Sequence, residues 1–320
     1  MEQQRASHRG SAHHHAAIRI PLRRRGMKAP LTMSDLYSSE MNMSGAPLRI
    51  SLIAAVTRSN GLGSGGGLPW TLPKEMSHFR RCTTVLPPRS SSSSHGANFT
   101  SPSTSPAKDQ RMNAVIMGRN TWESIPEKFR PLKGRWNVVV SRSMAASQLG
   151  ASGQKGSNGG PAQTLLANSL KGALDHLSKL QSLHLLGRTF MIGGAQLYAQ
   201  AMLTLPQHSS TASNDHHASP FVLDTLLITR LKSDLNCDVH LPEFRSDDQI
   251  RLDEKGTRDD SSTVISDSVG QQESKSRGRW KRATHEQFNE WLGATEKDLL
   301  PAGAVEEKGL EYELQMWLPA

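Results

Sequence analysis

Glu75 is the acidic residue whose surroundings best suit acid–base chemistry. It lies five residues after Trp70, beyond the glycine-rich segment SNGLGSGGG, in a stretch with the pattern of a helix, PKEMSHFRRC. Phe79 shares its helical face and Met76 lies beside it, so apolar side chains would surround the carboxyl group. Burial raises the pKa of a carboxyl group because it disfavours the charged form. The pattern therefore predicts a buried acid that can hold a proton near neutral pH.

The same features have ordinary interpretations. A Glu in the first turn of a helix is most often a solvated charge that interacts with the positive end of the helix dipole. A glycine-rich loop is most often a flexible connection. The chemistry expected of Glu75 therefore depends on what the rest of the chain places beside it.

Three further segments could bind anions. Residues 118–121 follow the apolar run AVIMG, where backbone N–H groups at a helix start can meet a phosphate. Ser141 and Arg142 end the next apolar run, and a guanidinium beside a hydroxyl can bind a phosphate monoester. The run FMIGGAQLYAQAM places a glycine pair before another helix, which lets backbone N–H groups approach a pyrophosphate. Ordinary loop charges and a tight turn without a ligand are the alternatives.

Two polar residues outside these segments are also candidates. Arg135 follows a turn that contains Pro131 and Gly134, and it could pair with a carboxylate. Alone it would be a surface arginine. Thr229, in the strand candidate DTLLITRL, could direct a hydroxyl at a ligand, although a threonine in a strand is usually structural.

These residues need a sheet whose strands end close to one another. RISLIAAV is almost continuously apolar, as in a strand covered on both faces of a mainly parallel sheet. The glycine-rich segment then lies at the carboxyl end of this strand and could close over a ligand. The other strand candidates are AVIMG, WNVVVS, FMIGG, DTLLITRL at 224–231 and LEYELQMWL at 310–318.

Composition indicates one folded domain. With 36% hydrophobic residues, 320 residues can bury one sizeable core. We expect a disordered basic N-terminal extension at 1–46 and a single domain at 47–320. Segments rich in Ser, Gly and charge should interrupt this domain as low-complexity surface insertions near 88–110, 145–163, 206–220 and 246–279.

Charge and cysteine content give weak support for nucleic-acid binding and none for a disulfide-rich or CxxC metal-binding protein. The net charge is +9, but residues 1–47 contribute seven Lys or Arg against three acids, so the charge is weak evidence for nucleic acid. Cys82 and Cys237 cannot build a disulfide framework or a CxxC metal site, and we predict no metal. No apolar stretch approaches transmembrane length.

The N-terminal extension bears on localisation. We expect a cytoplasmic protein, since a reducing compartment suits its cysteine usage. RIPLRRRGMK is Arg-rich and acid-poor, as transit peptides are, so mitochondrial targeting is the alternative. A disordered extension, or translation that begins at Met41 or Met43, is the simpler interpretation.

Taken together and in order, these segments resemble the dihydrofolate reductase family, and most closely its eukaryotic, fungal-like form with long insertions. The resemblance implies an α/β fold of three layers: a mostly parallel eight-stranded sheet, an antiparallel C-terminal strand and about four flanking helices. It runs from about Leu48 to Trp317 and is carried by GLGSGGGLPW with Glu75 downstream, VIMGRNTWESIP, RPLKGRWNVVVSR, MIGGAQLY, ITRL, CDVHLPEF and EKGLEYELQMW.

The resemblance implies reduction of 7,8-dihydrofolate to 5,6,7,8-tetrahydrofolate for one-carbon metabolism and thymidylate synthesis, with hydride transfer from NADPH to C6 and protonation at N5. Glu75 would hold the pterin and assist protonation, with Trp70 and Thr229 in the same hydrogen-bond network. Arg135 would pair with the α-carboxylate of the glutamate tail. The implied substrate-binding residues are Ile53, Ala55, Glu75, Met76, Phe79, Arg135 and Ile192.

The implied partners are small molecules. We expect a monomer that binds dihydrofolate and NADPH, with no membrane and no obligatory nucleic acid. Met76, Asn120 and Ala195 depart from the family's usual residues, which affects inhibitor affinity and cofactor grip more than the reaction. The implied cofactor-binding residues are Ala55, Gly61, Gly63, Leu68, Gly118, Arg119, Asn120, Thr121, Ser141, Arg142, Gly193, Gly194, Ala195, Gln196 and Tyr198.

Two other functions stay open at this point. A reductase of the same fold could act on a pyrimidine intermediate of flavin biosynthesis, although the PW…E run and Arg135 argue against it. A degenerate reductase domain could instead bind nucleic acid or protein through its basic tail. Glu75 and Trp70 disfavour this second alternative, which salt-dependent RNA affinity without folate turnover would support.

Overall fold

The computed structural model describes residues 46–88, 109–149, 163–207, 219–255 and 279–320, all of which belong to one compact unit, 45–320. The expected N-terminal extension lies outside the described residues, apart from Ala46. Most of each expected insertion lies outside them as well.

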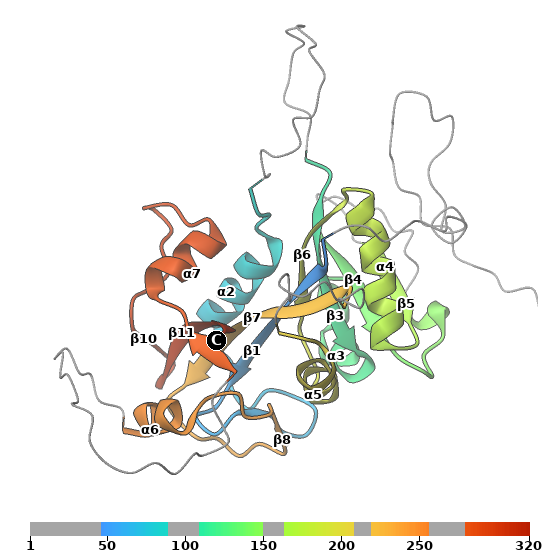
Figure 1. The fold of residues 1–320 in the computed structure, drawn as a ribbon. Helices are drawn as coiled ribbons and strands as arrows, with labels where there is room; N and C mark the ends of the chain where they lie inside the picture. Colours follow the sequence, from blue (N-terminus) through green and yellow to red (C-terminus); the bar gives the residue numbers. More distant parts are fainter. Residues whose placement is uncertain (1–45, 89–108, 150–162, 208–218, 256–278) are drawn as a thin grey trace, which may run out of the picture. The chain divides into compact units, whose positions relative to one another are not determined.

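A central sheet organises this unit (Figure 1). The eight strands along the sheet are, in spatial order, β10 (Ala304–Glu307), β11 (Leu310–Pro319), β7 (Phe221–Leu231), β1 (Leu48–Val56), β6 (Leu186–Met191), β3 (Met112–Gly118), β4 (Arg135–Val140) and β5 (Gln163–Ala167). The six strands from β7 to β5 in this order run parallel to one another, whereas β11 pairs antiparallel with β7 and with β10. The short β9 (Trp280–Arg282) pairs with the C-terminal part of β11.

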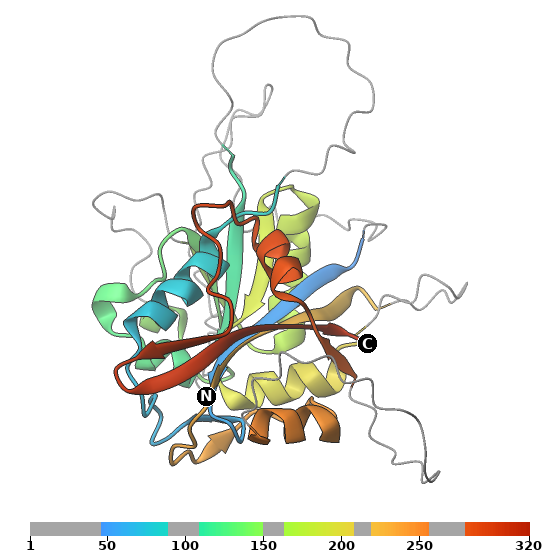
Figure 2. The ribbon, with the colours of Figure 1, turned by 90° about the vertical axis from the view of Figure 1, so that its left-hand side faces the viewer.

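The central strands owe their position to their sequences. Nearly every residue of β1 and β7 is buried, on both faces of the sheet. Continuous apolar runs of this kind suit strands that helices cover on both sides. The expected mostly parallel sheet with an antiparallel C-terminal strand is therefore confirmed. In Figure 2 the long, bent β10–β11 hairpin crosses the front of the unit.

Six α-helices lie within the described residues, against about four expected. α4 packs against β1, β4, β5 and β6, whereas α2 packs against β3 and α7 against β11. α2 begins with Pro73 in its first turn, where a missing N–H removes no intrahelical bond. The helices are α2 (Pro73–Thr84), α3 (Arg119–Ser124), α4 (Leu170–Ser182), α5 (Ala195–Thr204), α6 (Asp247–Lys255) and α7 (His285–Leu292).

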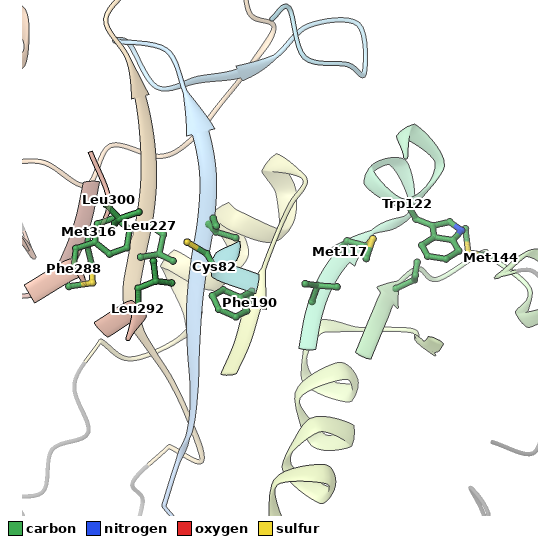
Figure 3. Packing of buried hydrophobic residues seen from close by; sticks show 13 residues of the cluster. Cys82, Met117, Trp122, Met144, Phe190, Leu227, Phe288, Leu292, Leu300 and Met316 are labelled. Atoms are coloured by element: carbon green, nitrogen blue, oxygen red, sulfur yellow. The ribbon is translucent and has the colours of Figure 1, made fainter. Parts of the chain in front are cut away.

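The largest apolar cluster described here joins the sheet to its helices (Figure 3). Phe190 of β6 and Leu227 of β7 are fully or almost fully buried in it, and Cys82 of α2 lies among them. Phe288 and Leu292 bring α7 onto the same cluster. This packing fixes α2, the helix that carries Glu75, against the sheet.

Two of the expected insertions contain regular structure. α6 occupies the first part of the segment near 246–279, and β5 begins at Gln163, at the end of the segment near 145–163. The polar composition of α6 concealed a helix whose Asp253 is bound by Arg245, at 2.7 Å. Composition does not reveal partners of this kind.

Two smaller elements complete the end of the sheet where β1 terminates. The glycine-rich segment starts with β2 (Gly61–Gly63), which pairs antiparallel with β8 (Val239–His240). Figure 1 shows β8 and α6 at this same end. Within the described ranges, no helix combines the length and apolar character that crossing a membrane requires.

Candidate functional site

Glu75 is buried, as its sequence context predicts. Glu75 is 6% exposed, and the hydroxyl of Thr229 in β7 donates a hydrogen bond to its carboxylate at 3.2 Å. The pKa of Glu75 is raised to about 7, mainly by burial and in part by the charge of Glu307, although the hydrogen bond from Thr229 acts in the opposite direction. A carboxyl group with this pKa is divided between its two protonation states at neutral pH, which suits an acid or base.

Glu307, at the end of β10, holds the first turn of α2. Its carboxylate accepts a hydrogen bond from the backbone N–H of Lys74 at 2.8 Å and lies 3.2 Å from the hydroxyl oxygen of Tyr312. Glu307 is only 8% exposed. An acidic side chain at a helix N-terminus satisfies a free N–H and interacts favourably with the dipole. The C-terminal hairpin thereby fixes the backbone next to Glu75.

Trp70 lies between the glycine loop and α2. It is 6% exposed and packs in a small cluster with Leu72, Leu231 and Tyr312. Its indole N–H is buried and has no hydrogen-bond partner in the part of the chain that the structure describes. A buried donor of this kind is available to a ligand or to solvent.

The expected substrate-pocket residues come from three elements. Ile53 is buried in β1, and Phe79 of α2 and Ile192 after β6 are partly buried against the same apolar cluster. Ala55 lies two residues after Ile53 and packs partly buried beside the Trp70 cluster. Met76 is 52% exposed, so its side chain contributes less to the interior than the helical pattern suggested.

Arg135 is buried and fixed at the start of β4. It is 4% exposed, and its guanidinium donates to the hydroxyl of Thr83 at 2.6 Å and to the carbonyl of Lys133 at 3.2 Å. Burial and the nearby Arg80 lower the pKa of Arg135 to about 10, which leaves it protonated at neutral pH. Arg135 is therefore not a surface arginine, which was the alternative interpretation of its sequence. A fixed guanidinium with free donors suits a carboxylate partner.

The glycine pair lies where β6 meets α5. The peptide bond between Gly193 and Gly194 is cis, and Gly193 has a φ of +116°. Gly118 donates its backbone N–H to the carbonyl of Gly193 at 2.8 Å, which joins the end of β3 to this turn. A Cβ added at Gly194 would lie 3.3 Å from the hydroxyl of Thr121.

Tyr198 connects this turn to β1. It is 4% exposed, and its hydroxyl donates to the carbonyl of Ile53 at 2.7 Å. A Cβ at Gly193 would lie 3.4 Å from the same hydroxyl oxygen. Burial raises the pKa of the Tyr198 phenol, which therefore keeps its proton.

The remaining expected cofactor residues are more exposed. Arg119 lies 3.6 Å from Glu123 and 3.4 Å from the hydroxyl of Ser143, in an exposed setting. The hydroxyl of Ser141 accepts backbone N–H groups and orders the turn that presents Arg142. Exposed side chains are also found at Arg142, Asn120, Gln196 and Leu68, the last 54% exposed.

The α5 N-terminus offers its backbone. Gly194 is its N-cap and provides no side-chain cap, so the first N–H groups of α5 are not occupied by a side chain. Ala195 begins this helix and is partly buried. Gly61 and Gly63 are both buried, so their backbone rather than any side chain faces the interior.

Sequence reasoning missed the contacts made by Glu307, Tyr312 and Thr83. The motif EKGLEYELQMW contains the first two and contributed to the resemblance, but nothing local to it indicates that Glu307 reaches the first turn of α2. Thr83 has a weak signal, since it directly follows the predicted helical stretch and lies four residues after Phe79, which places it on a similar face once the helix continues.

The sequence of the chain is similar to those of known dihydrofolate reductases. The sequence model of the dihydrofolate reductase family matches residues 49–87 and 108–270. A dihydrofolate reductase from Cryptococcus neoformans is 34% identical over 273 residues, which cover 84% of this chain and 94% of that protein. A dihydrofolate reductase from Pneumocystis carinii is 34% identical, and the match covers 84% of this chain and 95% of that protein. One from Saccharomyces cerevisiae is 33% identical, and the match covers 65% of this chain and 91% of that protein. The resemblance to fungal forms is thereby confirmed, and the chain belongs to the dihydrofolate reductase family.

Proposed function

We propose that this protein reduces 7,8-dihydrofolate to 5,6,7,8-tetrahydrofolate with NADPH, by hydride transfer to C6 and protonation at N5. Family membership supports the overall conversion and makes the chain an oxidoreductase of one-carbon metabolism. The observation that carries the finer proposal is the buried Glu75, whose pKa is about 7 and whose carboxylate Thr229 holds at 3.2 Å.

Glu75 supplies the proton and the orientation. Its carboxylate binds the amino and ring nitrogens of the pterin. Thr229 donates to one carboxylate oxygen and so fixes the direction in which the carboxylate accepts N–H groups of a ligand. The raised pKa keeps a substantial fraction of Glu75 protonated at pH 7, so it assists proton delivery to N5. The free indole N–H of Trp70 belongs to the same polar end of the pocket.

The apolar side chains around the pterin exclude water and hold the substrate at a fixed position relative to the cofactor. Ile53, Phe79 and Ile192 enclose the pterin between β1, α2 and the end of β6. Arg135 binds the α-carboxylate of the glutamate tail at the other end of α2, where Thr83 fixes the guanidinium. Holding the substrate at both ends places its reactive carbon reproducibly, which is a large part of catalysis in reactions of this kind.

The chain's residues fit a dinucleotide. The cis peptide at Gly193–Gly194 and the uncapped N-terminus of α5 present backbone to a pyrophosphate, where a Cβ at Gly194 would crowd Thr121. Arg142, with Ser141 ordering its turn, binds the 2′-phosphate. NADPH supplies a hydride when bound, and the protein holds it in place.

The direct test follows NADPH oxidation by absorbance with dihydrofolate added to the full chain, beside Glu75→Ala and Glu75→Gln. We expect both variants to lose at least about 100-fold in kcat/KM at pH 7, since a positioned general acid contributes that much or more. NADPH affinity, measured by titration without substrate, should stay within about twofold of the parent value.

Other outcomes favour the alternatives. Equal loss of NADPH affinity in the Glu75 variants would contradict the assignment of Glu75 to the pterin. No turnover by a folded parent protein, with salt-dependent binding of RNA instead, would favour the binding-module function. Turnover of a pyrimidine intermediate of flavin biosynthesis, and not of dihydrofolate, would favour the other reductase.

A further inference from the structure

A buried cluster of charged side chains lies at the end of the sheet that carries the glycine loop, and the proposed reaction uses none of them. Arg230 follows Thr229 in β7 and is 1% exposed. Arg245, in the loop before α6, is 7% exposed. Asp253 of α6 accepts a hydrogen bond from Arg245 at 2.7 Å and lies 3.8 Å from Nε of Arg230. Two buried arginines therefore share one carboxylate from α6.

This cluster is connected to the start of the glycine loop. Arg230 donates to the side-chain oxygen of Asn60 at 2.6 Å, and Asn60 donates to Glu243 at 3.0 Å. Glu243 also accepts two hydrogen bonds from the guanidinium of Arg245, at 2.8 and 2.9 Å. Asn60 is 3% exposed with a φ of +66°, a left-handed conformation that fixes the direction in which the chain enters Gly61.

Asp253 lies 3.8 Å from Nε of Arg230, on the side of the guanidinium that makes no hydrogen bond to the described residues. Nη1 of Arg230 donates to Asn60 and to the carbonyls of Thr57 and Arg58, at the end of β1. Its Nε and Nη2 are buried and have no hydrogen-bond partner in the described part of the chain. The carboxylate of Asp253 is the ion-pair partner on that side of the guanidinium, and the charge of Glu243 also acts on Arg230. Removal of one member of a buried ion pair leaves an uncompensated charge, which reorganises its neighbours.

We propose that Asp253 is a positioning residue, through which α6 holds Arg245, Arg230 and Asn60 and so sets the conformation of the glycine loop, Gly61–Gly67. This gives a role to a helix that lies in a segment expected to be only a surface insertion. The inference rests on the proposed function, because the glycine loop is taken to contact the cofactor.

The test compares Asp253→Asn with Asp248→Asn in the full chain. Asp248 is a matched control, because it lies on the same helix with a side chain 89% exposed, and its partner Arg251, at 3.7 Å, is also exposed. Amide hydrogen exchange is measured for peptides that span residues 57–68 without any ligand. NADPH affinity is measured by titration, and the KM values of NADPH and dihydrofolate by steady-state kinetics.

We expect Asp253→Asn to accelerate exchange in the glycine loop about tenfold, since local opening becomes easier. The Kd and KM of NADPH should rise roughly five- to tenfold, while the KM of dihydrofolate stays within about twofold. Asp248→Asn should match the parent protein in every measurement. Asp253→Glu, which restores the carboxylate, should recover most of the NADPH affinity.

A purely structural role for Asp253 would give a different pattern. It would lower kcat in proportion to the folded fraction of the protein and leave both KM values unchanged. Amide hydrogen exchange of the glycine loop would then equal that of the Asp248→Asn control. This pattern would overturn the inference. If Asp253→Asn does not fold, Arg245→Lys takes its place, and unchanged loop exchange in that variant overturns it equally. Failure of the proposed function is separate, because it shows as absent dihydrofolate turnover in the parent, whereas hydrogen exchange needs no ligand.

Discussion

The two halves of the site are built in different ways. Around Glu75 and Arg135, buried side chains hydrogen-bond to other side chains, and each group is fixed before a substrate arrives. Around Arg119 and Arg142, the charged groups are exposed, and the fixed parts are backbone: the cis peptide at Gly193 and the start of α5. Rigid buried groups suit orientation and proton transfer, whereas exposed cations suit the recognition of phosphate in water.

This contrast predicts that changes on the proposed pterin side, around Glu75 and Arg135, alter stability and pH behaviour as well as activity. Changes on the cofactor side should alter affinity alone. The variants below test this difference, from the largest expected effect to the smallest.

Glu75→Gln should stabilise the protein in alkaline solution. Burial raises the pKa of Glu75 from 4.5 to about 7, so the folded state pays to ionise it as the pH rises. The stability linked to this group is fully present below pH 4.5 and lost by about pH 7. Near pH 8 the free energy of unfolding of Glu75→Gln should therefore exceed that of the parent by about 3 kcal/mol.

Denaturant unfolding at pH 5 and pH 8 measures this effect. The advantage of the Gln variant should shrink towards zero near pH 4.5. Equal stability of the two proteins at pH 8 would mean that Glu75 is solvated, and the proposed contrast between the two halves would lose its main support.

Arg135→Lys should weaken binding of the substrate tail. Lysine keeps the charge but loses the planar double contact and the hydrogen bond to Thr83. We expect the KM of dihydrofolate to rise about 10- to 50-fold, which corresponds to one strong charge-assisted interaction. A dihydropterin without a glutamate tail is the control substrate, and its kcat/KM should be the same for both proteins. A loss of equal size with the control substrate would assign Arg135 a structural role instead.

Arg142→Ala should lower NADPH affinity about fivefold without changing the stability of the protein, because the side chain is exposed and its interaction is screened. Titration with NADH provides the comparison, since NADH lacks the 2′-phosphate. An equal loss for both nucleotides would place Arg142 away from that phosphate.

Glu307→Gln should shift the pH profile modestly. The charge of Glu307 raises the pKa of Glu75, so its removal lowers that pKa. The alkaline limb of kcat should move to lower pH by less than about one unit, while the amide still accepts the N–H of Lys74. A shift in the opposite direction, or a fall in kcat with no shift, would contradict this role.

The sequence predicted the parts of the site that depend on local pattern. The apolar run at Leu48–Val56 indicated a buried parallel strand, and the spacing of Glu75 and Phe79 placed the acid on an inward helical face. The glycine pair before α5 indicated a close approach of backbone. Each of these signals arises within about ten residues, where periodicity and steric limits act directly.

Sequence alone also underestimated the polar segments. α6 has the composition of a surface insertion, and only its position at the end of β7 reveals that Asp253 faces two buried arginines. β5 was missed because a short strand next to a glycine-rich segment gives little periodicity. The exposure of Met76 and Leu68 could not be predicted either, since it depends on which elements fold over each side chain.

By itself, the sequence determined the family, the class of fold and the position of a buried acid, because motifs and hydrophobic periodicity are local properties. The resemblance implied that Thr229 shares a network with this acid, but only the tertiary structure showed the contact itself and added the charge of Glu307. Thr229 is 154 residues from Glu75, and Glu307 is 233 residues from Lys74. Hydrogen bonds and charge effects act over a few ångströms of space, and only the folded sheet brings these positions together.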